Sequence, residues 1–153
     1  MGIRLNKFIA TAGGIGYLPL APGTWAALVF AAIWFFINKI FPGVYSWQII
    51  LILLFVFGGV YCSGKILNDR EKDPNYIVID EVAGMFLTLI FIPPTLLNIL
   101  AGFLLFRFFD IVKPFGIRKM EKLKKGWGIM FDDVLAGIYS TIVLRLLIVM
   151  KLW

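Results

Sequence analysis

The sequence contains no histidine and a single cysteine, Cys62, which excludes several kinds of chemistry. Without histidine, the chain has neither an imidazole base nor a site for a phosphohistidine intermediate. Cys62 has no partner for an intrachain disulfide, and Asn68 stands six residues after it, where a cysteine phosphatase loop carries arginine. No Asp-x-Asp-x-Thr, Ser-x-x-Lys or Gly-x-Ser-x-Gly segment supplies another nucleophile. The chemistry that remains is metal-assisted attack by water, with carboxylates as ligands and base.

Charged residues are also scarce. They make up 16% of the 153 residues, whereas 61% are hydrophobic and the mean hydropathy is +0.92. A soluble domain carries about 25% charged residues, so the composition predicts one integral-membrane domain over residues 1–153. We expect no secretory signal, because glycines and Pro19 interrupt the first apolar stretch. The net charge of +6 is better explained by loops facing an anionic leaflet than by nucleic-acid binding.

Four apolar blocks predict an all-α bundle. They cover residues 25–41, 47–63, 82–109 and 134–153. The first two are near the lower limit of about 17 residues for a membrane-spanning helix. The third is longer than the about 20 residues that one span needs, and Pro93-Pro94 interrupts it. It therefore forms either one kinked helix or a hairpin of two short helices.

The basic residues favour the hairpin. With a hairpin, residues 1–24, 64–81 and 107–133 share one side of the membrane and hold twelve of the fifteen lysines and arginines. A single span would instead export the lysine-rich segment 113–125. Because basic loops stay in the cytoplasm, the sequence predicts a polytopic membrane helical bundle of about four to five short spans, with these three segments in the cytoplasm.

All nine acidic residues fall on the same predicted side, and five lie within a residue or two of the end of an apolar block. The nine are Asp69, Glu71, Asp73, Asp80, Glu81, Asp110, Glu121, Asp132 and Asp133. The helix dipole stabilises acids at helix N-termini, which accounts for Asp80 and Asp132. It does not account for Asp110, which follows the apolar run LLFRFF at a predicted C-terminus. This crowding indicates a functional site.

Two acidic segments echo each other, IVIDEVAGMF at residues 77–86 and IMFDDVLAGIY at residues 129–139. In each, two adjacent acids are followed by Ala-Gly. On a helix, Asp80 shares a face with Gly84, and Asp133 shares a face with Gly137. A glycine one turn from an acid allows another backbone or a ligand to approach closely.

Four carboxylates brought together in this way need a cation or protonation. Oxygen ligands without histidine or cysteine suit Mg²⁺ or Ca²⁺, and Mg²⁺ commonly bridges carboxylates and phosphates. We therefore predict a metal site, with capping acids and interhelical salt bridges as the alternative. The predicted metal ligands are Asp80, Glu81, Asp132 and Asp133.

Two further segments contain candidate phosphate-binding residues. In FRFFDIVKP, Arg107 and Lys113 could hold phosphate oxygens while Asp110 joins the carboxylates. The alternative is a local salt bridge between Arg107 and Asp110, three residues apart. In GGIGYLPLAPGTWAAL, Thr24 is a predicted helix N-cap beside N–H groups that can bind an anion, and a structural turn explains this segment equally well.

The segment FGIRKMEKLKKGW carries apolar residues at steps of three and four with basic residues between them. They are Ile117, Met120, Leu123 and Trp127. This pattern predicts an amphipathic helix on the cytoplasmic leaflet.

With these segments placed, the chain resembles the phosphatidylglycerophosphatase A family. The resemblance rests on GYLPLAPGTW, IVIDEVAG, FRFFDIVKP and GIMFDDVLAGIY, in this order, and covers residues 13–139. It implies a Mg²⁺-dependent phosphatase that converts phosphatidylglycerophosphate to phosphatidylglycerol, in the bacterial inner membrane with its site facing the cytoplasm. One departure is Gly116, where the family pattern leads us to expect a second proline.

Carried over by motif, the resemblance implies metal-binding and catalytic roles for the four acids, with Asp80 or Asp133 taking the proton from water. It also implies that a group of four residues lines the headgroup site. That group is Thr24, Arg107, Asp110 and Lys113.

Two other classes remain as alternatives. Phosphatidyl-alcohol transferases also use interfacial aspartates and Mg²⁺, but their long Asp-Gly-x-x-Ala-Arg pattern is missing, since Val-Leu-Ala-Gly follows Asp133. A small ion channel or transporter would carry polar groups through its spans. Here Thr88, Ser140 and Thr141 are too few to line a path.

Overall fold

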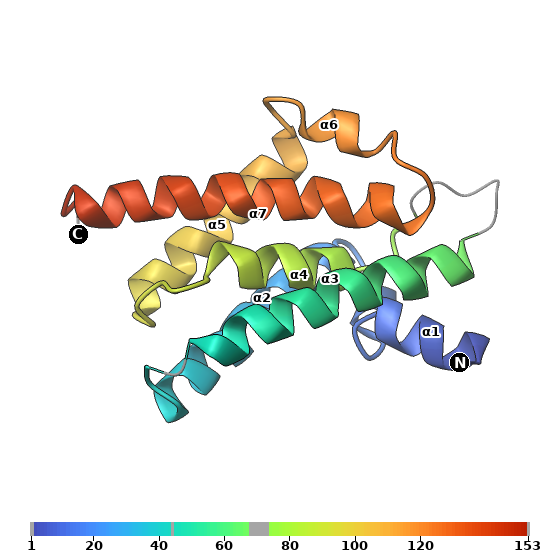
Figure 1. The fold of residues 1–153 in the computed structure, drawn as a ribbon, viewed down its shortest axis with the longest axis horizontal. Coiled ribbons are helices and arrows are strands. Elements are labelled where there is room, and N and C mark those ends of the chain that lie inside the picture. The colour runs from blue at the N-terminus through green and yellow to red at the C-terminus, as the bar shows by residue number, and fades with distance from the viewer. Residues whose placement is uncertain (1, 44, 68–73, 153) are drawn as a thin grey trace.

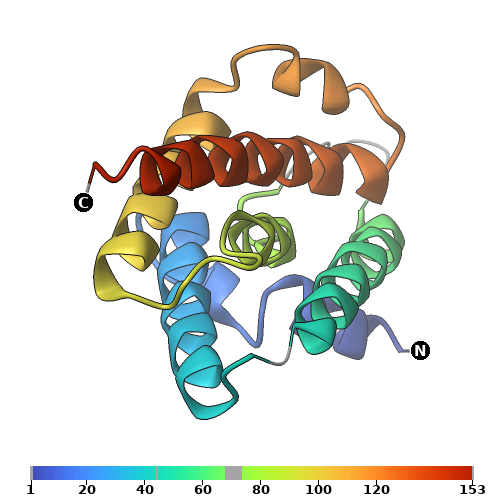
Figure 2. The same cartoon turned by 60° about the vertical axis from the view of Figure 1, so that its left-hand side comes forward.

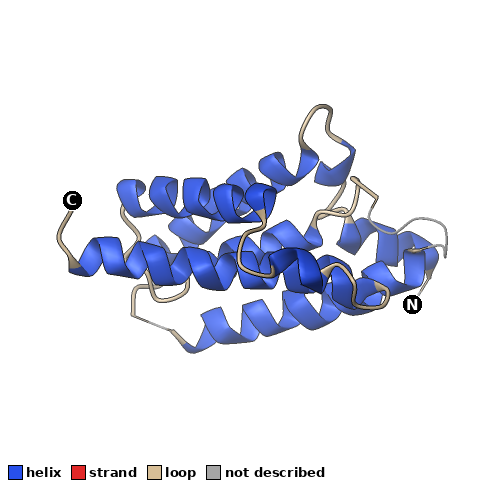
Figure 3. Ribbon diagram, turned by 90° about the horizontal axis from the view of Figure 1, so that it is seen from above, coloured by secondary structure: helices blue, strands red, loops and turns tan. Residues whose placement is uncertain are grey.

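The computed structural model describes residues 2–43, 45–67 and 74–152. This part of the chain contains seven α-helices, one short 3-10 helix and no strand (Figures 1 and 3). The α-helices are α1 (Ile3–Ala10), α2 (Pro22–Ile40), α3 (Ser46–Ile66), α4 (Ile79–Thr88), α5 (Leu96–Val112), α6 (Ile117–Met120) and α7 (Gly126–Val149); the 3-10 helix η1 covers Ile15–Tyr17. The all-α prediction is confirmed. Asp69, Glu71 and Asp73 lie outside the described residues.

The bundle has two ends, which are visible in Figure 1. At one end, here called the site end, lie α1, the residues just before α4 and the beginning of α7. At the other end, the turn end, lie the α2–α3 connection, residues 89–95 and the end of α7. The segments predicted to share one side of a membrane are thus gathered at the site end, apart from the residues outside the described ranges.

Two of the described helices, α2 and α3, are long and apolar enough to cross a membrane. The Pro93-Pro94 block is divided into α4 and α5, as the hairpin prediction required. However, α4 has only 10 residues, about 15 Å at 1.5 Å per residue, and is too short to span a bilayer. The structure therefore does not establish four to five spans.

Helix α4 occupies the centre of the bundle, with α2, α3, α5 and α7 around it (Figure 2). Eight of its ten residues are buried. The ring of Phe86 lies 4.8 Å from that of Trp34 on α2 and 5.3 Å from that of Phe55 on α3. Apolar burial on every side, rather than helix propensity, stabilises so short a helix.

Helices α4 and α7 cross at a pair of glycines. A Cβ atom on Gly137 would lie 2.6 Å from the carbonyl oxygen of Gly84, and one on Gly84 would lie 2.7 Å from that of Asp133. Only glycine permits this approach, because real Cβ contacts are longer. Of the two predicted possibilities for these glycines, another backbone or a ligand, the structure shows the backbone, and the contact brings the two acidic segments side by side.

A polar cluster of neutral groups joins three segments at the turn end. The buried Asn38 amide donates to the Trp34 carbonyl at 2.8 Å, and the Gln48 amide donates to Asn38 Oδ1 at 2.7 Å. Gln48 Oε1 then accepts the backbone N–H of Phe91 at 2.9 Å. The cluster therefore ties α2 and α3 to the turn between α4 and α5.

The predicted amphipathic helix over residues 117–127 is wrong. The helix α6 ends at Met120, and Lys125 adopts a left-handed φ of 54° before α7 begins. Five basic residues within residues 118–125 repel one another on a continuous helix, which favours the break. The unexpected Gly116 precedes α6 with φ 90°, which proline cannot adopt.

Candidate active site

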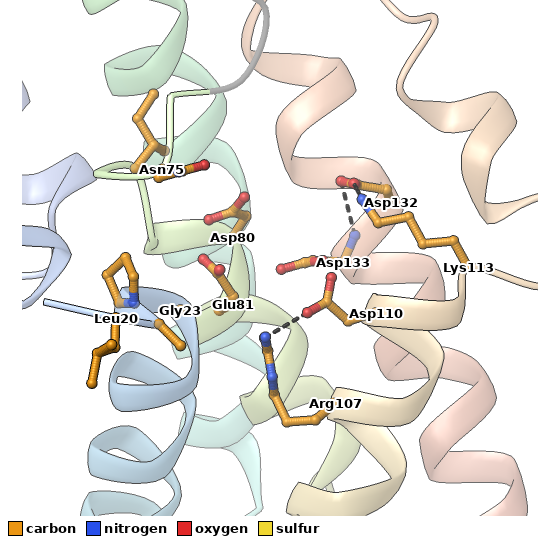
Figure 4. A pocket seen from close by; sticks show the side chains of 13 residues that line it. Leu20, Gly23, Asn75, Asp80, Glu81, Arg107, Asp110, Lys113, Asp132 and Asp133 are labelled. Atoms are coloured by element: carbon orange, nitrogen blue, oxygen red, sulfur yellow. Dashed lines mark hydrogen bonds and ion pairs between the residues drawn. The ribbon is translucent and has the colours of Figure 1, made fainter.

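A cavity of about 270 Å³ opens at the site end, among α2, α4, α5 and α7. Its lining includes five carboxylates and two basic side chains, so that negative groups exceed positive ones by three. The carboxylates belong to Asp80, Glu81, Asp110, Asp132 and Asp133, and the bases are Arg107 and Lys113 (Figure 4). The cavity thus gathers seven of the eight predicted site residues.

Three of the acids converge closely. Each of Asp80, Glu81 and Asp133 contributes an oxygen, and these oxygens lie within 4.8 Å of one another. Asp80 and Glu81 belong to the first turn of α4, where the helix dipole favours negative charge. Asp133 is brought to them by the glycine contact between α4 and α7.

Asp132 does not join this group. Its Oδ2 accepts a hydrogen bond from Lys113 Nζ at 2.6 Å, and its Oδ1 accepts from the Asp133 N–H at 3.1 Å. The structure thus brings three of the four predicted metal ligands together and places the fourth in an ion pair. The dipole interpretation of Asp132 is wrong, because α7 begins at Gly126 and Asp132 lies nearly two turns inside it.

Lys113 connects the end of α5 to α7 through an ion pair. It ends α5 in a left-handed conformation with φ 48°, and its ammonium contacts Asp132 and, at 2.9 Å, Glu121. Burial lowers the pKa of Lys113, but its hydrogen bonds with Asp132 and Glu121 outweigh burial and raise that pKa well above its usual value. Lys113 therefore remains cationic at any physiological pH.

Arg107 pairs with Asp110 across one turn of α5. The local salt bridge is therefore present, and both residues also line the cavity. The Nε of Arg107 is buried without a hydrogen-bond partner among the described residues. Arginine has five donors in a planar fork, so Arg107 keeps donors for a further acceptor.

The electrostatics of the converging acids are unfavourable without a cation. Glu81 and Asp133 immediately precede the apolar segments that begin at Val82 and Val134. Burial first, and then the negative charges of Asp110, Glu81 and Asp132, raises the pKa of Asp133 well above its usual value. Burial also raises the pKa of Glu81, and its hydrogen bond with Asp80 opposes this only in part.

A divalent cation fits this donor set. The ligands on offer are all carboxylate oxygens, which suit a hard cation such as Mg²⁺. Glu81 Oε2 is buried and has no hydrogen-bond partner among the described residues. A cation held by Asp80, Glu81 and Asp133 would satisfy that oxygen and offset the excess negative charge.

The structure does not place Thr24 where the sequence predicted it. Helix α2 begins at Pro22, so Thr24 is its third residue rather than its N-cap, and it does not line the cavity. Proline is tolerated at the first helical position, where its missing N–H would be unpaired in any case. Gly23 is the residue of this segment that approaches the acids, because a Cβ there would overlap Glu81 Oε1.

Sequence reasoning also missed six residues. Five of them line the cavity, namely Leu20, Ala21, Pro22, Asn75 and Ile77, and the sixth, Glu121, holds Lys113. The proximity of Ile77 to the acidic pair was a usable signal. Glu121 was hidden within a basic segment that was interpreted as a surface helix.

Comparison with known proteins gives a consistent result. The sequence profile of the family described as Phosphatidylglycerophosphatase A matches residues 8–148. A Haemophilus influenzae protein named phosphatidylglycerophosphatase A is 42% identical over 137 residues, which cover 88% of this chain and 83% of that protein. Its Escherichia coli namesake is 33% identical over 137 residues, covering 86% and 77%.

A third relative carries a different name. A Bacteroides thetaiotaomicron protein named putative phosphatidylinositol-3-phosphatase is 41% identical over 145 residues, which cover 92% of this chain and 91% of that protein. No solved structure matches the chain.

Proposed function

Since this chain belongs to the phosphatidylglycerophosphatase A family, we propose that it hydrolyses the terminal phosphomonoester of phosphatidylglycerophosphate, giving phosphatidylglycerol and phosphate. The chain is an enzyme of the phosphoric monoester hydrolase class, as its relatives are. We propose further that it depends on Mg²⁺ and acts at the cytoplasmic face of a bacterial inner membrane that it crosses several times. The observation that carries the proposal is the cavity in which three acids converge beside two bases.

Each group of the cavity has a role in this proposal. Asp80, Glu81 and Asp133 would hold the cation, which supplies charge neutralisation to the phosphate and makes water more acidic. Arg107 uses its remaining donors on the phosphate oxygens. Lys113 contributes positive charge while Asp132 and Glu121 fix its position.

The proton of the attacking water needs an acceptor within the cavity. Either Asp80 or Asp133 serves, since both lie among the converging oxygens and come from different helices. Asp132 is held by Lys113 and acts as a positioning residue. The proposal thus keeps the four acids in the site but gives Asp132 a different role from the other three.

The decisive experiment measures phosphate release from phosphatidylglycerophosphate in detergent micelles, with Mg²⁺ and with EDTA. We expect Mg²⁺-dependent release by the wild type and a loss of at least about a hundredfold in Asp133→Asn, the scale of a lost general base. Lys39→Gln is the control, because it also exchanges a charged side chain for an amide, but at an exposed position in the last turn of α2 that does not line the cavity. Release that survives EDTA would remove the metal from the proposal, and no release by folded wild type would remove the proposal itself.

A second substrate has direct support from one relative. The Bacteroides protein is named putative phosphatidylinositol-3-phosphatase. The lipid phosphatidylinositol 3-phosphate also carries a phosphomonoester, so its hydrolysis would use the same groups of the cavity. Assaying phosphatidylinositol 3-phosphate and phosphatidic acid beside phosphatidylglycerophosphate will rank the headgroups. A higher kcat/KM for the inositol lipid would reassign the substrate and leave the reaction type unchanged.

A further inference from the structure

The cavity has two chemically different walls. Acids and bases line the side formed by α4, α5 and α7, whereas the opposite side is the segment Leu20, Ala21, Pro22 and Gly23, and Asn75 and Ile77 complete the lining. Figure 4 shows Leu20 and Gly23 on this side, beside the first turn of α2 and across the cavity from Asp110 and Lys113. A site for a small soluble phosphate has no need of an apolar wall, whereas a lipid phosphate presents both polar and apolar groups.

Leu20 is the outermost part of that wall. Leu20 as a whole residue is 99% exposed although it lines the cavity, and its backbone has a left-handed φ of 73°. Leucine rarely adopts this conformation, and an outlier of this kind points to a functional constraint. The chain here holds an apolar side chain outward, at a backbone position better suited to glycine or asparagine.

The position of Leu20 along the fold matches the chemistry of a lipid. It lies two residues before α2, which is one of the two helices able to cross a membrane. Trp25 in the first turn of α2 is 46% exposed, and tryptophan favours the depth at which headgroups meet acyl chains. Leu20 is therefore placed between the charged cavity and the apolar phase.

We propose that Leu20 is a specificity-determining residue that contacts the acylated glycerol part of the substrate while the phosphomonoester reaches the acids. This inference rests on the proposed lipid phosphatase function and names the part of the lipid that the chain recognises. Leu20 does not act on the phosphate. Its contribution is apolar contact with the substrate, which the deacylated headgroup cannot provide.

The test compares kcat/KM for phosphatidylglycerophosphate with kcat/KM for its deacylated, water-soluble headgroup. In Leu20→Asn the ratio of the two values should fall roughly tenfold, the lower end of the effect of burying one leucine. Asparagine tolerates the left-handed conformation, so this variant removes the apolar side chain without added backbone strain. Leu20→Met should keep most of the ratio.

Leu18→Asn is the matched control. Leu18 belongs to the same loop and is 44% exposed, but it does not line the cavity and has an ordinary φ of −67°. We expect this variant to keep the wild-type ratio. An equal fall in Leu18→Asn would mean that the loop serves general membrane contact, and the proposal for Leu20 would be overturned.

The remaining outcomes are also decisive. An unchanged ratio in Leu20→Asn, or equal losses on both substrates, would overturn the inference while leaving the phosphatase function intact. Failure of the wild type on every phosphate offered would instead overturn the proposed function. If the wild type acts only on acylated substrates, the comparison uses a short-chain and a long-chain phosphatidylglycerophosphate instead of the acylated and deacylated substrates. The increase in kcat/KM with chain length must then be smaller in Leu20→Asn than in the wild type.

Discussion

The two ends of the bundle both bury polar side chains, but they satisfy them differently. At the turn end, Asn38 and Gln48 bond to each other and to backbone groups, all of them neutral. At the site end, five carboxylates share a cavity with two bases, and an oxygen of Glu81 has no hydrogen-bond partner among the described residues. A paired neutral cluster stabilises a fold, whereas an excess of buried charge is costly and is retained for function.

The largest effect is expected when Mg²⁺ is added, because the cation supplies the positive charge that the carboxylates at the site end lack. At a Mg²⁺ concentration of about 100 Kd, the free energy of unfolding should rise by about 2.7 kcal/mol relative to EDTA. Thermal unfolding in detergent measures it, with NaCl at equal ionic strength as the control for screening. Glu81→Gln should lose most of the shift. A full shift in that variant would place the cation elsewhere.

At the turn end, removing a polar group should destabilise. Gln48→Leu leaves Asn38 Oδ1 and the Phe91 N–H without their partner, so the free energy of unfolding should fall by about 2 kcal/mol. Denaturation in detergent measures the change, and phosphate release by the folded fraction should match the wild type. If Gln48→Leu left stability intact, the cluster would not be holding the two turns together.

The close packing at the site end gives a smaller, local effect. Gly23→Ala places a Cβ against the Glu81 carboxylate, and displacing that acid should lower kcat about tenfold. Gly58→Ala on α3 is the matched control, because no atom lies within 4 Å of the added Cβ. It should leave kcat unchanged and stabilise α3 slightly. Equal kcat in the two variants would show that Glu81 adapts to the displacement.

The smallest expected effect reverses the sign seen at the turn end. In EDTA, at a pH high enough to ionise Asp133, Asp133→Asn removes the repulsion from Asp110 and Glu81, so the free energy of unfolding should rise by about 1 kcal/mol. Chemical denaturation of both proteins without metal measures the difference. A destabilised Asp133→Asn would mean that the acid makes structural bonds and that the two ends do not differ in kind.

Several of these features were predictable from sequence because they depend on local pattern. The identical spacing of Asp80 to Gly84 and Asp133 to Gly137 predicted close approach of another backbone or a ligand, and Pro93-Pro94 with the distribution of basic residues predicted the division between α4 and α5. These inferences need helix geometry and the absence of an N–H on proline. The convergence of the acids followed from the contact.

The features that failed depend on partners distant in sequence. Asp132, like Asp80, is the first acid of its pair, but Asp80 lies in the first turn of α4 whereas Asp132 lies well inside α7 and pairs with Lys113. The start of α2 at Pro22 moved the functional position from Thr24 to Gly23. The number of spans stays a prediction, because the short α4 is buried among other helices and only α2 and α3 of the described helices are long and apolar enough to cross a membrane.

The central position of α4 has a consequence for how the protein responds to its surroundings. Lipid can press on α2 and α3, whereas α4 touches mostly protein, and α4 provides Asp80 and Glu81. Changes in bilayer thickness or tension that tilt the outer helices reach these acids through the packing of α4 against α2 and α3 and through its glycine contact with α7. The carboxylates of α4 are thus mechanically coupled to the outer helices, so a change in the surrounding membrane can reach the site without any direct contact between lipid and the acids.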